Sequence, residues 1–280
     1  MALRSGEGFL KIVGEVGCGK TVLCRQLLRS LQGECVTAYI PNPDLGPKDL
    51  LLALAKELGL KVAASATRHR LLDALHACLL AHAAQGRGVV VIIDEAQAIP
   101  LRTVESLRLL SNLETEKRKL LQIVLLGQPE LERKLARVEI RQLLQRITFS
   151  EYLGPMAAPR VPDYLKHRLG IAAIDVHTDL DLFEPAAALA LAHYSAGVPR
   201  LVNVLANKCL MLAYGENRHR VTEAHARMAA SDTAGIDLDA DGVASSWWGR
   251  LLGGRFRPQA QREALRPGGA SLDKHPKARP

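Results

Sequence analysis

The sequence has 280 residues, of which 48% are hydrophobic, and its 37 lysines and arginines against 29 aspartates and glutamates give a formal net charge of +8. This length allows one large domain or a core with a smaller partner domain, and the hydrophobic content excludes a wholly disordered chain. No apolar run approaches the ~20 residues of a membrane-spanning helix, and residues 1–7 lack the apolar run of a signal peptide, which predicts a cytosolic chain.

Between residue 8 and residue 150, short β-branched runs alternate with longer segments whose apolar residues recur every three or four positions. The runs indicate strands buried on both faces of a parallel sheet: Phe9–Val13, Cys35–Ile40, Val89–Ile93, Gln122–Leu126 and Ile147–Tyr152. The longer segments indicate helices: Lys20–Leu31, Leu50–Leu58, Arg68–Ala84 and Arg102–Lys117. This alternation predicts an α/β fold, a parallel five-stranded sheet flanked by helices.

A different organisation is expected after residue 155, where the strand signals stop and Pro155, Pro159 and Pro162 mark a joint. The following helices are expected: Pro162–Leu169, Pro185–Ser195, Pro199–Tyr214 and Thr222–Ala230. From Gly235 onward glycine, proline and arginine accumulate, which is typical of a disordered tail. The predicted domains are therefore a core at residues 1–155, a small all-helical domain at 156–233 and a basic tail at 234–280.

A glycine-rich loop lies between the first strand and the first helix. Residues 14–21 fit the complete pattern G-x-x-x-x-G-K-[ST], in the strand–loop–helix context that a phosphate-binding loop requires. Lys20 is expected to reach the β- and γ-phosphates of a nucleotide, and the Thr21 hydroxyl to bind Mg²⁺. The residues predicted to bind the nucleotide are Gly14, Glu15, Val16, Gly17, Cys18, Gly19, Lys20, Thr21 and Val22.

The chain has five cysteines, none in a Cys-x-x-Cys pair or beside paired histidines, which excludes a disulfide framework and a thiolate metal site. Cys18 lies inside the glycine-rich loop and allows two interpretations. Its thiol could be redox-sensitive, with a pKa lowered by the helix end and Lys20. Alternatively, Cys18 is a small residue tolerated where only the backbone is used.

Two acids follow the third strand. Asp94 and Glu95 end the buried run Val89–Ile93, and buried carboxylates need a cation or hydrogen-bond donors. Asp94 is predicted to hold Mg²⁺, and Glu95 to polarise an attacking water as general base. The alternative is a polar strand end without a chemical role. An acid pair in this order favours hydrolysis over transfer to a small-molecule acceptor.

Three further polar residues are candidates for the same site. Gln128 follows the fourth strand and is predicted to touch the γ-phosphate or the attacking water, or else it only forms a turn. Arg146 precedes the fifth strand and is predicted to reach a neighbouring subunit's γ-phosphate, or else it belongs to a solvated basic helix face. Arg200 stands in a first helical turn, where a cation is unfavourable without an anion nearby; the alternative is an exposed cap residue.

In this order, the phosphate loop, Asp94-Glu95, a polar sensor at Gln128, an arginine finger at Arg146 and a second sensor at Arg200 resemble an AAA+ ATPase. Longer stretches are similar to the general secretion pathway A (ExeA-like) family, and in particular to its MSHA pilus-biogenesis (MshM) branch. These stretches are Ser5–Phe9, which runs into Gly14–Thr21, and then Asp94–Gln97, Leu109–Thr115, Gln122–Leu131 and Gln145–Phe149.

The resemblance implies a P-loop core followed by a helical lid domain, with ATP and Mg²⁺ as ligands. It also implies a cytoplasmic homo-oligomer that assists pilus or type II secretion assembly proteins at the inner membrane. Lys20, Glu95, Gln128, Arg146 and Arg200 would be the catalytic residues, and Thr21 and Asp94 the metal ligands. Family members begin with a longer leading segment, and we expect that this chain is shortened there.

Two other functions stay open from the sequence. The net charge permits an ATP-dependent DNA-binding switch, although no helix-turn-helix follows the helical domain. A scaffold that binds nucleotide without hydrolysing it is the other alternative. In the tail, Trp247, Trp248 and Arg250 suit a shallow, weak peripheral contact with a membrane, or else the tryptophans dock on the chain's own helical domain.

Overall fold

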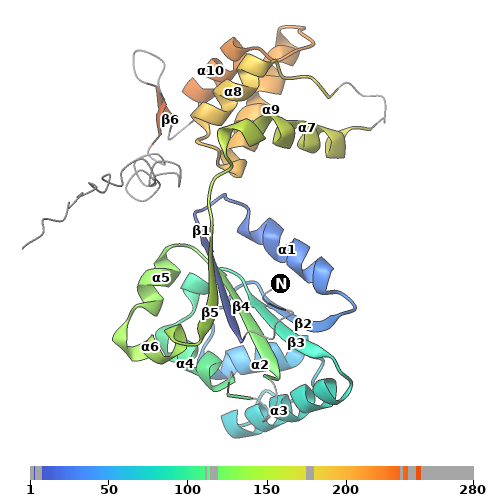
Figure 1. The fold of residues 1–280 in the computed structure, drawn as a ribbon, viewed down its shortest axis with the longest axis vertical. Helices are drawn as coiled ribbons and strands as arrows, with labels where there is room; N and C mark the ends of the chain where they lie inside the picture. The colour runs from blue at the N-terminus through green and yellow to red at the C-terminus, as the bar shows by residue number, and fades with distance from the viewer. Residues whose placement is uncertain are drawn as a thin grey trace, which may run out of the picture. The chain divides into compact units, whose positions relative to one another are not determined.

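The computed structural model describes residue 3 and residues 8–110, 112–113, 119–174, 180–233, 236–238 and 244–246 (Figure 1). The chain divides into two compact units. The first consists of Met1–Ala157 with Gly197–Val204, and the second of Ala158–Ala196 with Leu205–Pro280. Gly197–Val204 thus lies with the core, whereas the sequence placed it in the helical domain. The tail tryptophans, Trp247 and Trp248, lie outside the described residues.

A five-stranded parallel sheet forms the centre of the first unit, with strand order β2-β3-β4-β1-β5, and this confirms the predicted fold class. Its strands are β1 (Phe9–Gly14), β2 (Cys35–Ile40), β3 (Gly88–Ile93), β4 (Leu121–Gly127) and β5 (Ile147–Leu153). The helices between them are α1 (Lys20–Leu31), α2 (Pro47–Glu57), α3 (Arg68–Ala84), α4 (Leu101–Leu110), α5 (Glu130–Leu135) and α6 (Arg141–Leu144). Short 3₁₀ turns lie at Ala96–Ala98 and Val138–Ile140.

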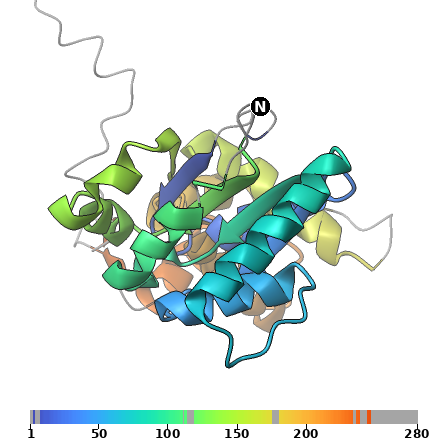
Figure 2. The ribbon, with the colours of Figure 1, turned by 90° about the horizontal axis from the view of Figure 1, so that it is seen from below.

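Helices cover the two faces of the sheet unequally. Val89, Val91 and Ile93 of β3 pack in one core with α2, α3 and α4, while Val90 and Ile92 pack on the opposite face with α1. This alternation follows from the period of two in a strand, and it explains why β3 is apolar throughout. Figure 1 shows α1 on one side of the sheet, and Figure 2 shows α3 running beside α2 on the other.

The expectation that all five strands are buried on both faces is wrong for the two outer ones. β3 and β4 are buried along almost their whole length, whereas β2 is half-buried at four of its six positions and β5 has only exposed and half-buried residues. The strand order gives the physical reason, because β2 and β5 are the edges of the sheet and each pairs with a single neighbour.

The second unit is mainly helical. Its helices are α7 (Val161–Ala172), α8 (Pro185–Tyr194), α9 (Pro199–Gly215), whose first turns belong to the first unit, and α10 (Glu223–Ser231), with a 3₁₀ turn at Ala158–Arg160. Two three-residue strands, β6 (Ile236–Leu238) and β7 (Ala244–Ser246), pair antiparallel, which the sequence did not predict. Ile236, Asp237 and Leu238 do alternate in polarity, but three residues are too few to signal a strand.

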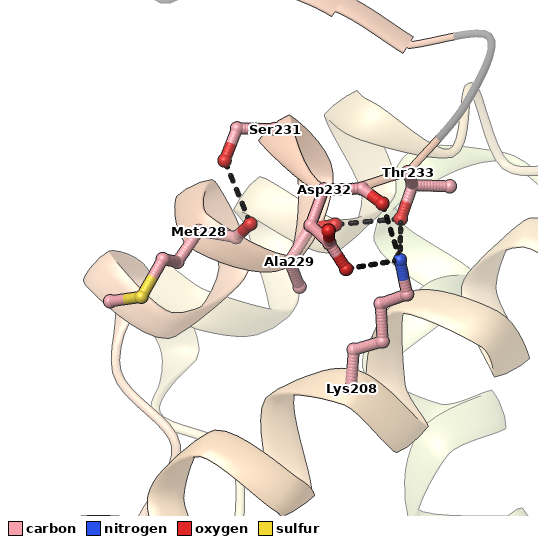
Figure 3. Close-up of polar contacts among 6 residues, drawn as sticks. All are labelled: Lys208, Met228, Ala229, Ser231, Asp232 and Thr233. Carbon is pink, nitrogen blue, oxygen red and sulfur yellow. Dashed lines mark hydrogen bonds and ion pairs between the residues drawn. The ribbon is translucent and has the colours of Figure 1, made fainter.

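A lysine ties α9 to the end of α10 (Figure 3). Lys208 Nζ donates hydrogen bonds to the Asp232 carbonyl oxygen at 2.6 Å, to Asp232 Oδ2 at 2.8 Å and to Thr233 Oγ1 at 3.0 Å. An ammonium group at this position is favourable because the carboxyl end of a helix carries partial negative charge. The hydrogen bond from Lys208 to the Asp232 carboxylate, followed by the charge of Lys208, lowers the pKa of Asp232. No helix in the described residues is both long and apolar enough to cross a membrane.

Candidate functional site

The glycine-rich loop connects the carboxyl end of β1 to the first turn of α1. Gly14 leaves no room for a side chain, because a Cβ there would lie 2.5 Å from the Leu153 carbonyl oxygen of β5. Gly17 and Gly19 have φ angles of +84° and +95°, which other residues rarely adopt. These glycines therefore allow a tight turn that leads directly into the amino terminus of α1, where backbone N–H groups favour an anion.

Lys20 and Thr21 occupy the first turn of α1. The Lys20 side chain is buried, and its Nζ donates to the Gly14 carbonyl oxygen at 2.7 Å and to the Glu15 carbonyl oxygen at 3.0 Å. Thr21 Oγ1 donates to Asp94 Oδ2 at 3.1 Å. The ammonium group thus lies folded over the loop, at the place where the charge of a phosphate group would be balanced.

Asp94 follows β3 and is 3% exposed. Its Oδ2 accepts from Thr21, and its Oδ1 accepts from the Glu95 N–H at 2.9 Å. Thr21 and Asp94 supply hard oxygen ligands, the kind that Mg²⁺ prefers. Within the described part of the chain, no three or more His, Cys, Asp or Glu residues gather to hold a metal. One carboxylate and one hydroxyl fit Mg²⁺, because this ion keeps several waters and takes its remaining ligands from nucleotide phosphates.

Glu95 is turned toward β4 by an unusual backbone conformation, with φ at 49°. Its Oε2 accepts hydrogen bonds from Gln97 Nε2 at 2.5 Å and from Gln128 Nε2 at 3.0 Å. Burial raises the pKa of Glu95, but the two amide donors and the charge of Lys20 outweigh it and hold this pKa below its ordinary value. The carboxyl group is therefore ionised and half-buried, which suits a general base that binds a water.

Gln97 and Lys134 are the residues that sequence reasoning missed. Gln97 Oε1 accepts from the Gln128 N–H at 3.0 Å, and the Lys134 ammonium donates to the carbonyl oxygens of Gln97 and, at 2.6 Å, Ile99. Gln97 stands in the stretch Asp94–Gln97 without a predicted role. A polar amide just past the end of a central strand is the signal that could have found it.

Two cysteines lie near the loop, and neither carries a lowered thiol pKa. Burial raises the pKa of Cys18 although Lys20 opposes this, so the interpretation as a redox-sensitive thiol with a lowered pKa is wrong. Burial and the charge of Asp94 raise the pKa of Cys24 to about 11, and burial together with Cys24 and Asp94 raises that of Tyr39 to about 12. Cys24 and Tyr39 stay neutral at physiological pH and leave the charges to Lys20, Asp94 and Glu95.

The remaining loop residues differ in exposure. Glu15 and Val16 are half-buried, and burial, followed by the charge of Glu130, raises the pKa of Glu15. Val22 is 70% exposed on the first turn of α1, directly after Thr21. This apolar side chain is thus exposed to solvent beside the loop, and its contact with a nucleotide stays a prediction.

Arg200 lies beside the loop within the first unit. Its N–H donates to the Gly17 carbonyl oxygen at 3.2 Å, and a Cβ at Gly17 would lie 2.9 Å from the Cβ of Arg200. The approach depends on Gly197, which has a φ of +72° and accepts a hydrogen bond from the Met156 N–H at 2.8 Å. The exposed Arg200 side chain therefore starts next to the residues that form the loop.

Arg146 is not brought to the loop of its own chain. It precedes β5, whose first residue, Ile147, pairs with Phe9, whereas Gly14 at the loop pairs with Leu153. Arg146 lies seven residues before Leu153, which at about 3.3 Å per residue separates it from the loop by roughly 20 Å. Arg146 is half-buried and lies at the amino end of β5, whereas the loop lies beside the carboxyl end of this strand. Any contact of its guanidinium with nucleotide would thus involve the nucleotide of another subunit.

Comparison with known proteins agrees with this geometry. Residues 3–135 match the family model described as AAA domain. This part of the chain is therefore similar to AAA domains. General secretion pathway protein A of Aeromonas hydrophila is 38% identical over 267 residues, which cover 91% of this chain and 48% of that protein. The chain thus spans about half the length of this curated relative, and the expected resemblance to general secretion pathway A is confirmed. The MSHA branch stays a prediction.

Solved structures share the fold of this chain at low sequence identity. The ORC2 protein of Aeropyrum pernix, in ADPNP–ADP complexes, superposes with a TM-score of 0.61 at 20% identity, covering 86% of this chain and 66% of that one. The RuvB Holliday junction branch migration motor of Thermotoga maritima gives 0.56 at 17% identity, with 90% and 69% covered. Both likenesses concern the fold alone.

The close approach of Arg200 to the loop generates a testable prediction about nucleotide binding. Gly17→Ala should weaken ATP binding about tenfold or more, because the added Cβ would collide with Arg200 and displace the loop. Gly33→Ala is the matched control, since Gly33 has a φ of +86° but no atom within 4 Å of an added Cβ. Both variants should lose about 1 kcal/mol of stability from backbone strain.

Isothermal titration with ATP and thermal melting measure the two effects separately. Equal loss of ATP affinity in both variants would mean that backbone strain alone explains the effect. Unchanged affinity in Gly17→Ala would show that the contact with Arg200 does not shape the binding loop.

Proposed function

We propose that this chain is an AAA ATPase that binds ATP with Mg²⁺ and hydrolyses it. The observation that carries the proposal is the contact between Thr21 and Asp94, at 3.1 Å, with Glu95 as the next residue on the same edge of the sheet. The glycine-rich loop, an oxygen pair suited to Mg²⁺ and the Glu95 carboxylate thus lie together, which supports the proposal. Mg²⁺, when bound, would neutralise negative charge that develops on the phosphates.

Each residue has a distinct part in the proposed reaction. Lys20 leaves the carbonyl oxygens of Gly14 and Glu15 and donates to the phosphates, which offer a stronger, charged acceptor. Glu95 accepts a proton from the attacking water, for which its ionised state is required. Gln128, held on Glu95 at 3.0 Å, senses the γ-phosphate or the water from the end of β4. Arg200 balances phosphate charge beside Gly17.

We further propose that the chain works as a cytoplasmic homo-oligomer in the assembly of a type II secretion or MSHA-like type IV pilus machine at the inner membrane. The similarity to general secretion pathway protein A supports the secretion context. The placement of Arg146 supports oligomerisation, because this arginine lies about 20 Å from its own loop. The proposed partners are inner-membrane assembly proteins of such a machine, and the weak membrane contact of the tail stays a proposal outside the described residues.

The two alternative functions predict different experimental results. An ATP-dependent DNA-binding switch is permitted by the net charge of +8, and DNA retardation that persists at physiological salt would favour it. A scaffold that binds nucleotide without hydrolysing it would show ATP binding without phosphate release. The ionised Glu95 beside Asp94 supports ATP hydrolysis rather than a scaffold that only binds nucleotide.

Separate substitutions should divide binding from chemistry. Glu95→Gln should retain ATP binding and lower turnover about 10²- to 10⁴-fold, because the amide cannot take a proton from water. Lys20→Ala should instead weaken ATP binding by about 10- to 100-fold, the value of one or two charge-assisted hydrogen bonds. Titration calorimetry and phosphate release measure the two quantities. Undiminished turnover in Glu95→Gln would contradict the assignment of the general base.

Subunit mixing tests the proposed part of Arg146. Arg146→Ala alone should lose about 10³-fold or more in turnover, as expected for an arginine finger. Mixing it with Lys20→Ala subunits should restore part of the activity, since an intact loop and an intact arginine then meet at some interfaces. Turnover per subunit should also rise with protein concentration. A wild-type protein with full turnover as a monomer would contradict the prediction.

A further inference from the structure

The side-chain amide of Gln97 joins two parts of the candidate site. Its Nε2 donates to Glu95 Oε2, and its Oε1 accepts from the Gln128 N–H at 3.0 Å. Glu95 follows β3 and Gln128 follows β4, so a single amide connects the ends of two central strands. Gln128 closes the ring, because its own Nε2 also donates to Glu95 Oε2 at 3.0 Å.

The orientation of this amide is fixed by its two partners. If it were reversed, its oxygen would face the Glu95 carboxylate and its NH₂ group would face the Gln128 N–H, so that both hydrogen bonds would become repulsive. Gly127 permits this placement, because a Cβ at this position would lie 3.1 Å from Gln97 Oε1. The amide therefore presents one N–H to Glu95.

These hydrogen bonds make the two carboxylate oxygens of Glu95 different from each other. Both amide donors bind Oε2, and among the described residues no hydrogen-bond donor lies on Oε1. Oε1 is thus the oxygen left to accept a hydrogen bond from a water. Glu95 has a left-handed backbone conformation, and its N–H donates to Asp94 Oδ1 at 2.9 Å. Both features fix the direction in which the Glu95 side chain leaves the strand.

Lys134 fixes Gln97 from the side of α5. Its ammonium group donates to the backbone carbonyl oxygens of Gln97 and Ile99, which hold the turn after Glu95 against this helix. Lys134 is half-buried. Burial, followed by the charge of Arg137, lowers its pKa. Two short bonds to carbonyl oxygens compensate the partly desolvated ammonium group.

We propose that Gln97 is a positioning residue for ATP hydrolysis: it holds the Glu95 carboxylate through Oε2 and leaves Oε1 directed to take the proton of the attacking water, while Lys134 holds Gln97 in place. This proposal rests on the proposed function and goes beyond it, since it assigns to Gln97 and Lys134 parts that neither the loop pattern nor the acid pair predicts. No atom of Gln97 is required to touch the nucleotide.

The split between kcat and KM tests the proposal. Gln97→Met retains the length of the side chain but lacks the donor, so it should lower kcat about 10- to 100-fold and leave the KM for ATP within about twofold of wild type. Gln97→Glu also retains the length but places an acceptor against Glu95 Oε2, so it should displace the Glu95 carboxylate and lower kcat further, again with little change in the KM.

Lys134→Met provides a second variant that leaves the amide itself intact. It should reduce kcat by a smaller factor than Gln97→Met, again with little change in the KM, because Gln97 is then less firmly held. Gln85→Met, at the exposed end of α3, is the matched control and should behave as wild type. Thermal melting of every variant shows whether the fold is intact, and a folded Lys134→Met keeps the test valid if Gln97→Met unfolds.

Each outcome decides the question. A kcat within about twofold of wild type in folded Gln97→Met and Gln97→Glu, or a loss that lies in the KM alone, overturns the positioning role. Glu95→Gln measured alongside separates this result from a failure of the proposed function. If Glu95→Gln abolishes turnover but kcat is unchanged in the Gln97 variants, only the role of Gln97 is refuted, whereas full turnover in Glu95→Gln refutes the proposed general base itself.

Discussion

The buried carboxylate of Asp94 is the constraint on which the rest of the site depends. At 3% exposure an ionised carboxylate without donors or a cation is strongly unfavourable, and Asp94 receives the Thr21 hydroxyl on one oxygen and the Glu95 N–H on the other. These bonds hold the first turn of α1 against the end of β3. They also set the direction in which Glu95 leaves the strand, which in turn places its carboxylate near Gln128 at the end of β4.

The parallel sheet makes this concentration of polar groups possible. In the order β2-β3-β4-β1-β5, the ends of β3, β4 and β1 are neighbours, so the acids, Gln128 and the glycine-rich loop share one edge. Glycines then allow the backbones to approach. Gly14 lies against the Leu153 carbonyl oxygen, and Gly17 lies against Arg200, at distances that a side chain would prevent. The charges that face one another at this edge are therefore held by backbone contacts as well as by side chains.

The glycine-rich loop and the acid pair could be predicted because their chemistry resides in adjacent residues, between a strand and a helix that are themselves visible in the apolar pattern. The exposure of β2 and β5 could not, because strand order depends on pairings between distant segments, whereas periodicity describes each strand alone. Cys18 shows a second limit. A helix end and Lys20 suggest a lowered thiol pKa, but burial acts in the opposite direction and is stronger. Gln97 was missed because its contacts depend on the left-handed turn at Glu95, which no residue type announces.

The central claim is that Thr21 and Asp94, together with the loop, form one binding site for ATP and Mg²⁺. Titration of ATP into the wild-type chain with Mg²⁺ and with excess EDTA tests it most directly, when the same pair of titrations is repeated for Asp94→Asn. The account predicts that Mg²⁺ tightens binding to the wild type by about tenfold or more, equivalent to about 1.4 kcal/mol, and that this gain is largely lost in Asp94→Asn. Equal ATP affinity of the wild type with Mg²⁺ and with EDTA would contradict it.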